Sequence, residues 1–473
     1  MRKKHDPKHK NTIQTSKAHI GHINREGSDS GMREGVVTLL LGITIVLVIM
    51  NTMMFNLALS DVAKEFSLTA SATSWIVTGY SIVFAISSIT YSRLADFIPI
   101  RRLFIIGILS LSLGAIAGLF SNSFAMLLIV RIVQASGAGS IPALALVLLS
   151  RYIPIQRRGK AMAMIMSSVA FGLGFGPVVG GIVVEYLGWK LLFVVTAVTL
   201  VLVPFYMLMI PKEEPRKGSF DAIGAFFIGV GTTGLLLFLT NHSVIALLAG
   251  LVSIVLFIIR IRSAKDPFVL PALFSNRSFL ILGAVGIAAY LCSFATLFLM
   301  PQILVKQYGL SAIQAGLVIF PGSALAMIVS RKVGRIIDAR GNSSLIRYTP
   351  LFLLASVILF ALLEGVSFLA ILFIYMLMSV SYTILTSSIS NEISRLLLPS
   401  QIASGLGLYQ LLQFFSGAFG VAATASALVW QKDFPLAHAY SNIYWGLTLV
   451  VILSIICAIG YLRAGMPKPQ TVS

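Results

Sequence analysis

Residues 161–184 read AMAMIMSSVAFGLGFGPVVGGIVV, an apolar run that contains no charged side chain. A helix needs about 20 mostly apolar residues to span the hydrocarbon core of a bilayer, so this run predicts a membrane-spanning helix. Thirteen similar runs occupy most of the chain, and none alternates as barrel strands do. The fourteen predicted spans are 36–59, 74–92, 103–121, 125–148, 161–184, 189–210, 222–240, 243–259, 279–300, 311–330, 348–363, 367–388, 402–428 and 441–462.

The composition excludes an ordinary soluble protein. Of the 473 residues, 57% are hydrophobic and 11% are charged, whereas charged residues make up about a quarter of a soluble domain. Arg131 is the one charged side chain that lies well inside a predicted span. We therefore expect an all-α integral membrane protein, since helices satisfy their own backbone hydrogen bonds in lipid.

Basic residues concentrate in alternate loops. The net charge is +19, and Lys and Arg gather in the connections after spans 2, 4, 6, 8 and 10, while each odd-numbered connection holds at most one lysine. Basic loops stay cytoplasmic, so this pattern predicts a multi-pass protein of the cytoplasmic membrane with both termini inside. The distribution favours a lipid bilayer over nucleic acid as the partner.

The first 35 residues differ from the rest of the chain. Residues 1–35 carry eight Lys or Arg and four acids without an apolar period, which predicts a disordered basic tail on the cytoplasmic side. Its histidines could bind a metal, but a tail lying against an anionic leaflet is the preferred interpretation, and we predict no metal site or cofactor. The histidines are His5, His9, His19 and His22.

An internal repeat links the second and tenth spans. SRLADFIPIRRLF at 92–104 and GRIIDARG at 334–341 both place an aspartate at a helix end within a basic turn. Parallel repeats of this kind build one large class of transporters. The repeat predicts an N-terminal six-helix half at 36–210, two inserted helices at 211–277, a C-terminal six-helix half at 278–463 and a cytoplasmic tail at 464–473.

The glycines of the fifth span favour close helix packing. In GLGFGPVVGG at 172–181, Gly172, Gly176 and Gly180 recur every fourth residue and open one face to a neighbouring helix. Pro177 removes a backbone donor and bends the helix, and Gly181 completes the pattern. A generic packing seam is the alternative interpretation.

Arg131 begins the stretch RIVQASGAGSIP at 131–142. A buried arginine stays protonated and is costly near the bilayer centre, so it should face a cavity or a partner. Two interpretations stay open. In the first, Arg131 and Gln134 take part in transport and coupling. In the second, the guanidinium has a structural role and bonds Gln134 and neighbouring carbonyl groups.

Together these stretches resemble the major facilitator superfamily. The glycine stretch is similar to the motif of its antiporters, and the stretch at 131–142 to its R-x-x-Q-G-x-G motif, with Ala135 replacing the first glycine. The loop at 92–104 resembles its cytoplasmic motif in a degraded form. The resemblance implies a cytoplasmic gate formed by Asp96, Arg101, Arg102, Asp338 and Arg340.

Within that superfamily the chain resembles the fourteen-span drug:proton antiporters, especially the Gram-positive tetracycline–metal/proton antiporters. The supporting stretches are MNTMMFNLAL at 50–59, SRYIP at 150–154, RGKA at 158–161, DPFV at 266–269 and IFPG at 319–322. The resemblance implies a monomeric bacterial transporter, not an enzyme. It would export a small drug-like or tetracycline-like molecule in exchange for protons, by alternating access.

One part of the family pattern is missing. Thr52, Leu173 and Gly417 stand where the tetracycline antiporters carry intramembrane acids. This absence favours an alternative, a facilitator or differently coupled exporter of a metabolite, and a membrane sensor that transports nothing is a third possibility. The polar residues expected to line a cavity, each of which could equally be an interhelical hydrogen bond, are Asn51, Thr52, Asn56, Tyr382, Gln410 and Gln413.

Overall fold

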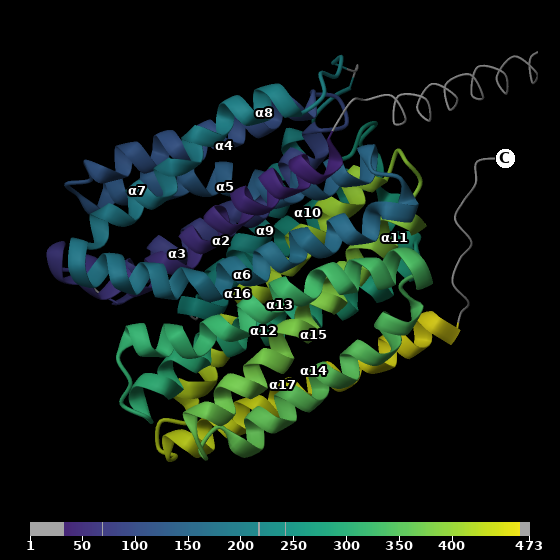
Figure 1. The fold of residues 1–473 in the computed structure, drawn as a ribbon. Coiled ribbons are helices and arrows are strands. Elements are labelled where there is room, and N and C mark those ends of the chain that lie inside the picture. Colours follow the sequence, from purple (N-terminus) through teal and green to yellow (C-terminus); the bar gives the residue numbers. More distant parts are fainter. Residues whose placement is uncertain (1–32, 69, 216–217, 242, 464–473) are drawn as a thin grey trace, which may run out of the picture.

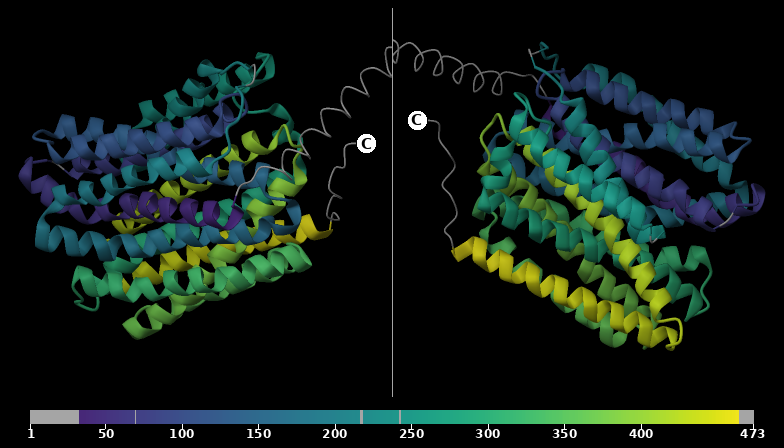
Figure 2. Two further views of the ribbon diagram at one scale, coloured as in Figure 1. Left: turned by 45° about the horizontal axis from the view of Figure 1, so that its top comes forward. Right: turned by 180° about the vertical axis from the view of Figure 1, so that it is seen from behind.

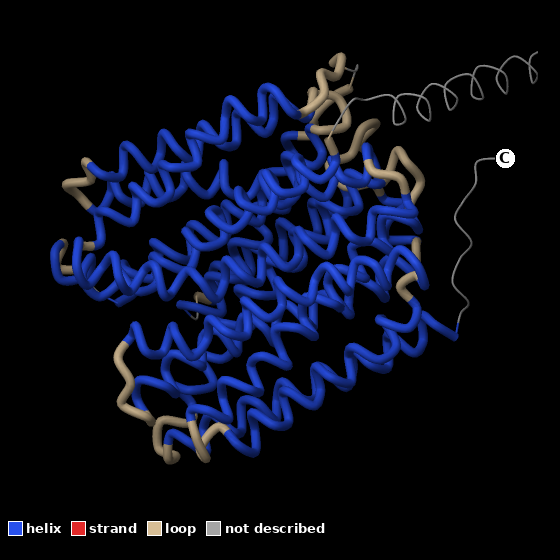
Figure 3. Tube along the Cα trace, viewed as in Figure 1, coloured by secondary structure: helices blue, strands red, loops and turns tan. Residues whose placement is uncertain are grey.

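The computed structural model describes residues 33–463 apart from residues 69, 216–217 and 242. The described residues form helices joined by short loops (Figure 3). The predicted C-terminal tail at 464–473 lies outside the described residues. So do residues 1–32 of the predicted N-terminal tail, which include its four histidines.

The first six predicted spans correspond to five long helices and one divided helix. The divided span runs over Trp189–Met209 as short α-helical and 3-10 segments in direct succession. The segments are α2 (Glu34–Glu65), α3 (Ala70–Leu94), α4 (Ile100–Leu119), α5 (Phe124–Tyr152), α6 (Ile155–Leu187), η1 (Trp189–Leu191), α7 (Leu192–Ala197), η2 (Val198–Leu202) and α8 (Val203–Met209).

The remaining helices follow in the order of the predicted spans, with one short additional helix, α11, before the ninth. They are α9 (Ala222–Asn241), α10 (Val244–Ser263), α11 (Pro271–Ser275), α12 (Arg277–Lys306), α13 (Ala312–Arg340), α14 (Ser343–Leu363), α15 (Phe368–Leu396), α16 (Ile402–Trp430) and α17 (Leu436–Arg463).

Length and hydropathy identify these helices as membrane spans. Within the described residues, 13 helical stretches are long and apolar enough to cross a membrane, and α9 adds the shorter apolar stretch Ala222–Phe238. Large apolar side chains on their outer faces are exposed, as on α10, where Ile245 is 82% exposed. A bilayer solvates such surfaces. The prediction of an all-α membrane protein is confirmed.

The axes of the long helices are roughly aligned, and the helices pack as a long bundle (Figures 1 and 2). Helix α6 lies against α2 on one side and against α13 on the other, and α3 lies against α16. Helices α9 and α10 pack on each other through Gly234 and Gly250, where an added Cβ would meet the neighbouring backbone. These small residues let the two backbones approach closely.

The two ends of the bundle differ in charge. We call the end where α3, α5, α13 and α15 finish the basic end, because its loops and helix termini carry Arg101, Arg157, Lys160 and Arg335. It is drawn on the right in Figure 1. The other end, on the left in Figure 1, is the opposite end. There the helix termini separate into an upper and a lower group.

Candidate functional site

Arg131 lies in the first third of α5 and is buried between two aromatic rings. Its guanidinium carbon lies 4.0 Å from the ring centroids of both Phe55 on α2 and Tyr80 on α3. Arg131 is only 1% exposed. Such cation–π contacts stabilise a desolvated cation by about 2 kcal/mol or more each. None of the ion pairs found among the described residues involves Arg131.

Neutral amides complete the surroundings of Arg131. Its Nη1 donates to Gln134 Oε1 at 3.3 Å and to Asn51 Oδ1 at 3.5 Å. Asn51 also accepts the Thr196 hydroxyl at 2.9 Å and donates to the Tyr80 hydroxyl at 3.3 Å. The arginine is therefore held within its own half, and this geometry favours the structural interpretation of its role.

Two other residues expected to line a cavity lie close to this group on α2. Thr52 is half-buried, and its hydroxyl donates to the Val48 carbonyl at 3.4 Å. Asn56 is exposed, and its amide lies 4.0 Å from the Met53 sulfur. Thr52 also hydrogen-bonds the side chain of Tyr80, so it belongs to the surroundings of Arg131, whereas the contact of Asn56 stays on its own helix.

Buried polar side chains from α12, α15 and α16 form a second group, which we call the central polar cluster. All are at most 1% exposed. The amide nitrogen and oxygen of both glutamines have no hydrogen-bond partner among the described residues. Buried polar groups are nearly always hydrogen-bonded, so these four atoms need an explanation. The cluster comprises Tyr290, Tyr382, Tyr409, Gln410 and Gln413.

The face of α16 that carries Gln410 is turned toward α3. Gly407 packs closely on Ser92 and Ile89 of α3, and residues three and seven positions further along a helix share its face. Gln410 and Phe414 occupy those positions. The unpartnered amide therefore lies at the boundary between the helices of the first and second halves of the chain.

A series of aromatic rings crosses this boundary. Phe84 on α3 has its ring centroid 4.3 Å from that of Phe414. On one side Tyr80 lies 6.1 Å from Phe84, and on the other Tyr290 lies 5.7 Å from Phe414 and 5.2 Å from Tyr382. The Phe84–Phe414 contact thus lies between Arg131 with its surrounding side chains and the central polar cluster.

The glycines of α6 lie against α2. A Cβ added to Gly172, Gly176 or Gly180 would come within about 3 Å of Ile49, Met53 or Met54 respectively. Pro177 lies inside α6, and Gly181 is buried. Gly174, which faces elsewhere on α6, meets Ser323 of α13. The spacing of the glycines predicts a close helix contact on this face, but it does not identify α2 as the neighbour and does not predict the contact with α13.

At the basic end, α13 is bonded to α6. Asp338, in the last turn of α13, accepts the backbone N–H groups of Gly159 at 2.7 Å and Lys160 at 3.1 Å. Asp96, its counterpart in the repeat, lies in the turn after α3 and forms an ion pair with Arg93 at 2.5 Å. The two aspartates of the repeat therefore have different contacts.

The predicted basic residues of the gate make fewer contacts. Arg101 is half-buried, and Arg102 and Arg340 are exposed. None of the three forms an ion pair with another described residue. Asp338 and a neighbouring arginine both make contacts between the two halves at this end.

That arginine, Arg158 on α6, is absent from the sequence-based prediction. It donates to the Ser394 hydroxyl of α15 at 3.2 Å and to the Ser394 carbonyl at 3.5 Å. It also donates to the Ser150 and Ile153 carbonyls at 2.5 and 3.1 Å. In the sequence Arg158 is one of several cations in a loop, and no sequence pattern distinguishes it as buried.

Glu213 is a second residue that the sequence does not single out. It follows α8 and accepts the Ile100 backbone N–H at 2.9 Å, Arg151 at 2.7 Å and the Tyr152 hydroxyl at 2.6 Å. Burial by itself raises the pKa of Glu213, but these donors and the Arg151 charge outweigh it and hold the pKa below its usual range. Glu213 therefore joins the ends of α4, α5 and α8.

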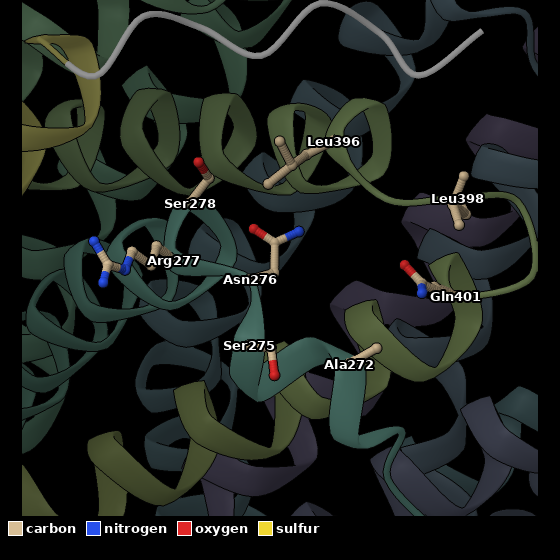
Figure 4. Close-up of a pocket in the computed structure, with 8 residues that line it drawn as sticks. All are labelled: Ala272, Ser275, Asn276, Arg277, Ser278, Leu396, Leu398 and Gln401. Carbon is tan, nitrogen blue, oxygen red and sulfur yellow. The ribbon is translucent and has the colours of Figure 1, made fainter. Parts of the chain in front are cut away.

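A surface pocket of about 680 Å³ lies at the basic end, away from the central polar cluster. Figure 4 shows it between the junction of α11 and α12 and the junction of α15 and α16. Asn276 and Gln401 supply polar groups, and Arg277 points away from Leu398. Its lining includes none of the predicted site residues.

Comparison with known proteins agrees with this architecture. The Major Facilitator Superfamily model matches residues 41–421. The riboflavin transporter RibZ of Clostridioides difficile (strain 630) is 25% identical over 445 residues, which cover 90% of this chain and 97% of that protein. The lincomycin resistance protein LmrB of Listeria monocytogenes serovar 1/2a is 25% identical over 388 residues, which cover 79% and 82%.

Solved structures share the fold at much lower sequence identity. The crystal structure of the human organic anion transporter MFSD10 (TETRAN) is similar with a TM-score of 0.68 and 16% identity, covering 90% of this chain and 99% of that chain. The fold and a family match over most of the sequence lead to the same conclusion. The chain belongs to the major facilitator superfamily.

Proposed function

We propose that this protein exports an uncharged, drug-like organic molecule from the cell by alternating access. As a member of the superfamily the chain is a secondary transporter of a small molecule and not an enzyme. The observation that carries the proposal is the pair of buried glutamines, Gln410 and Gln413, whose four amide atoms lack partners. A bound solute that donates and accepts hydrogen bonds would satisfy them.

The chemistry around the glutamines defines the class of solute. Phe414 lies on the same helix as the glutamines, and its ring centroid is 5.7 Å from that of Tyr290, so the two rings supply flat apolar surface. No carboxylate belongs to the central polar cluster, and the charge of Arg131 is covered by Phe55 and Tyr80. A site of this kind suits planar neutral molecules better than lipophilic cations, which usually need an anionic partner. Tetracycline-like compounds remain one candidate.

In the proposed cycle the two six-helix halves, 36–210 and 278–463, rock about the central polar cluster, with 211–277 as an insertion. By the positive-inside rule the basic end faces the cytoplasm in this scheme, and the bacterial relatives support a bacterial cell membrane. The contacts of Asp338 and Arg158 then hold the cytoplasmic side closed, and breaking them accompanies opening to the inside. The protein works as a monomer in this scheme.

Protons are the proposed coupling ion for export. A second candidate function keeps the fold but makes the protein a facilitator or differently coupled transporter of a metabolite. The alignment with the riboflavin transporter over 97% of that protein favours it. So does the lack of a carboxylate in the central polar cluster. The two candidates differ in whether a pH gradient drives movement of the solute.

Everted membrane vesicles test both candidates. Riboflavin, lincomycin and tetracycline with a divalent metal are supplied in turn, while solute uptake and the luminal pH are recorded. Saturable uptake with proton release from the lumen supports proton-coupled export. Saturable uptake of riboflavin without a pH response supports the metabolite transporter. Absence of saturable uptake with every compound, compared with vesicles lacking the protein, contradicts the proposed transport of this class of solute.

A further inference from the structure

Glu364 is a buried carboxyl group at the opposite end of the bundle, directly after α14. The residue is 3% exposed, and its Oε2 has no hydrogen-bond partner among the described residues. Most acids at this end differ from it. Glu65, for example, accepts Lys190 at 2.9 Å and the Trp189 indole N–H at 2.6 Å. Because an isolated buried carboxylate is costly, Glu364 is suited to bind a proton.

The groups that face Glu364 are neutral. From the end of α12 these are Gln307, whose amide hydrogen-bonds the carboxyl, and Tyr308, whose hydroxyl donates to the Glu364 carbonyl at 2.8 Å. From α17 they are Tyr440 and Tyr444, both of which interact with the carboxyl electrostatically.

Charged neighbours are directed elsewhere. Lys306, at the end of α12, donates to Gln302 at 3.2 Å, and His438 at the start of α17 is exposed. The first turn of α15, Phe368–Ile371, contains no titratable side chain. No ion pair among the described residues includes Glu364. Burial therefore raises the pKa of Glu364 to about 7, despite its bond from Gln307.

The carboxyl is also connected to the helix that carries part of the central polar cluster. Gln307 and Tyr308 attach the end of α12 to Glu364, and the same helix carries Tyr290. Pro301 lies between them inside α12, where it removes a backbone donor and weakens the helix. A change of charge at Glu364 would thus alter the anchoring of the part of α12 that follows Pro301.

We propose that Glu364 takes up the coupling proton from the external side and that its charge state sets the position of the outer end of α12. This inference rests on the proposed function, because it supplies the carboxyl that the central polar cluster lacks. In the conformation of this structure, loss of the proton would leave a carboxylate buried among neutral groups, which is costly. Deprotonation therefore favours a different conformation, in which Glu364 gains access to water.

The first experiment needs no transported solute. Infrared difference spectra of the reconstituted protein are recorded while the pH is changed by about two units on either side of neutrality. We expect a carboxylic-acid carbonyl band that disappears with a midpoint near 7 and is absent in Glu364→Gln. Gln307→Met, which removes a donor to the carboxyl, should move the midpoint upward. Asp433→Asn, at an exposed acid of the same end, should leave the band unchanged.

The second experiment measures transport in everted vesicles, where the lumen corresponds to the external side. Acidifying the lumen through neutrality should accelerate solute uptake in the wild type. Glu364→Gln should lose this acceleration but keep exchange of solute across the membrane. Persistence of both the carbonyl band and the acid response in Glu364→Gln would overturn the inference. Failure of the wild type to move any solute, with the band present, would contradict the proposed function alone.

Discussion

Asp338, in the last turn of α13, accepts the backbone N–H of Gly159 on α6 at 2.7 Å, so a side chain of the second half is bonded to the main chain of the first. Gly159 has no room for a larger residue, because an added Cβ would lie 2.6 Å from the Asp338 carboxylate oxygen. The close approach at the basic end therefore depends on both residues.

Asp338→Asn should favour opening of the basic end. Hydrogen bonds to charged groups contribute about 1.5–3 kcal/mol, and asparagine keeps one acceptor oxygen without the charge. A loss of about 1.4 kcal/mol shifts the equilibrium between closed and open states by about tenfold. Gly159→Ala should act in the same direction through steric conflict with Ile337.

Distances between spin labels at Arg102 and Ser344 measure this opening, with Cys292 and Cys457 replaced by alanine in all samples. Both labelled positions are exposed at the basic end, one in each half. Both variants should increase the population of long distances. Glu214→Gln, at an exposed acid of the same end, serves as the control. Unchanged distance distributions in both variants would show that other contacts hold this end closed.

Arg131→Ala should lower the stability of the protein and its yield. It removes the cation held between Phe55 and Tyr80 and leaves the buried oxygens of Asn51 and Gln134 without that donor. An unsatisfied buried group costs about 1–3 kcal/mol. Thermal unfolding monitored by size-exclusion fluorescence measures the loss.

Arg131→Lys distinguishes a structural from a transport role. Lysine keeps the charge but lacks the planar group that stacks between the two rings, so stability should recover only in part. If Arg131 is structural, the transport rate per folded molecule should stay close to that of the wild type in Arg131→Lys. A folded, stable Arg131→Lys protein without transport would instead support a direct role for Arg131 in transport.

Replacing Gln410 or Gln413 by methionine should separate stability from function. Methionine is similar in size and removes the unpartnered buried amide, so the variants should be as stable as the wild type or more stable, by roughly 1 kcal/mol for each site. Transport should fall at the same time, because sites that bind solutes are often costly to the empty protein. Leu411→Met, between them on α16, is the control and should preserve transport.

Stability should depend on Glu213 in a pH-dependent way. Because the pKa of Glu213 is held below its usual range in the folded protein, its carboxylate stabilises the fold above the ordinary carboxyl pKa, and this contribution is lost as the pH falls through the folded value. Glu213→Gln should therefore lower the unfolding temperature at neutral pH. The difference from the wild type should disappear in acid, whereas a difference that persists there would exclude the ionised carboxylate as its source.

The sequence is sufficient to predict the spans because the rule that governs them is local. Twenty apolar residues identify a helix wherever its neighbours lie, and even the divided span at Trp189–Met209 follows this rule. The glycines at 172, 176 and 180 predict a close contact for the same reason, since their spacing places them on one face.

The contacts between distant residues are much harder to predict. The environments of Arg158 and Glu213 depend on which loops meet at the basic end, and Arg158 reaches Ser394 across 236 positions of sequence. Tyr290 and Tyr409 belong to the central polar cluster only because α12, α15 and α16 pack together. Glu364 is visible in the sequence as an acid at a span end, but its burial and its electrostatic interaction with Tyr440 and Tyr444 are tertiary properties.

The position of Arg131 between Phe55 and Tyr80 also bears on biosynthesis. Phe55 belongs to α2 and Tyr80 to α3, and both helices leave the ribosome before α5 does. When the arginine enters the bilayer during synthesis, the two rings and the Asn51 amide that receive it are already in the membrane. The costly cation therefore has its partners at the moment of insertion, and its passage into lipid does not depend on the second half of the chain.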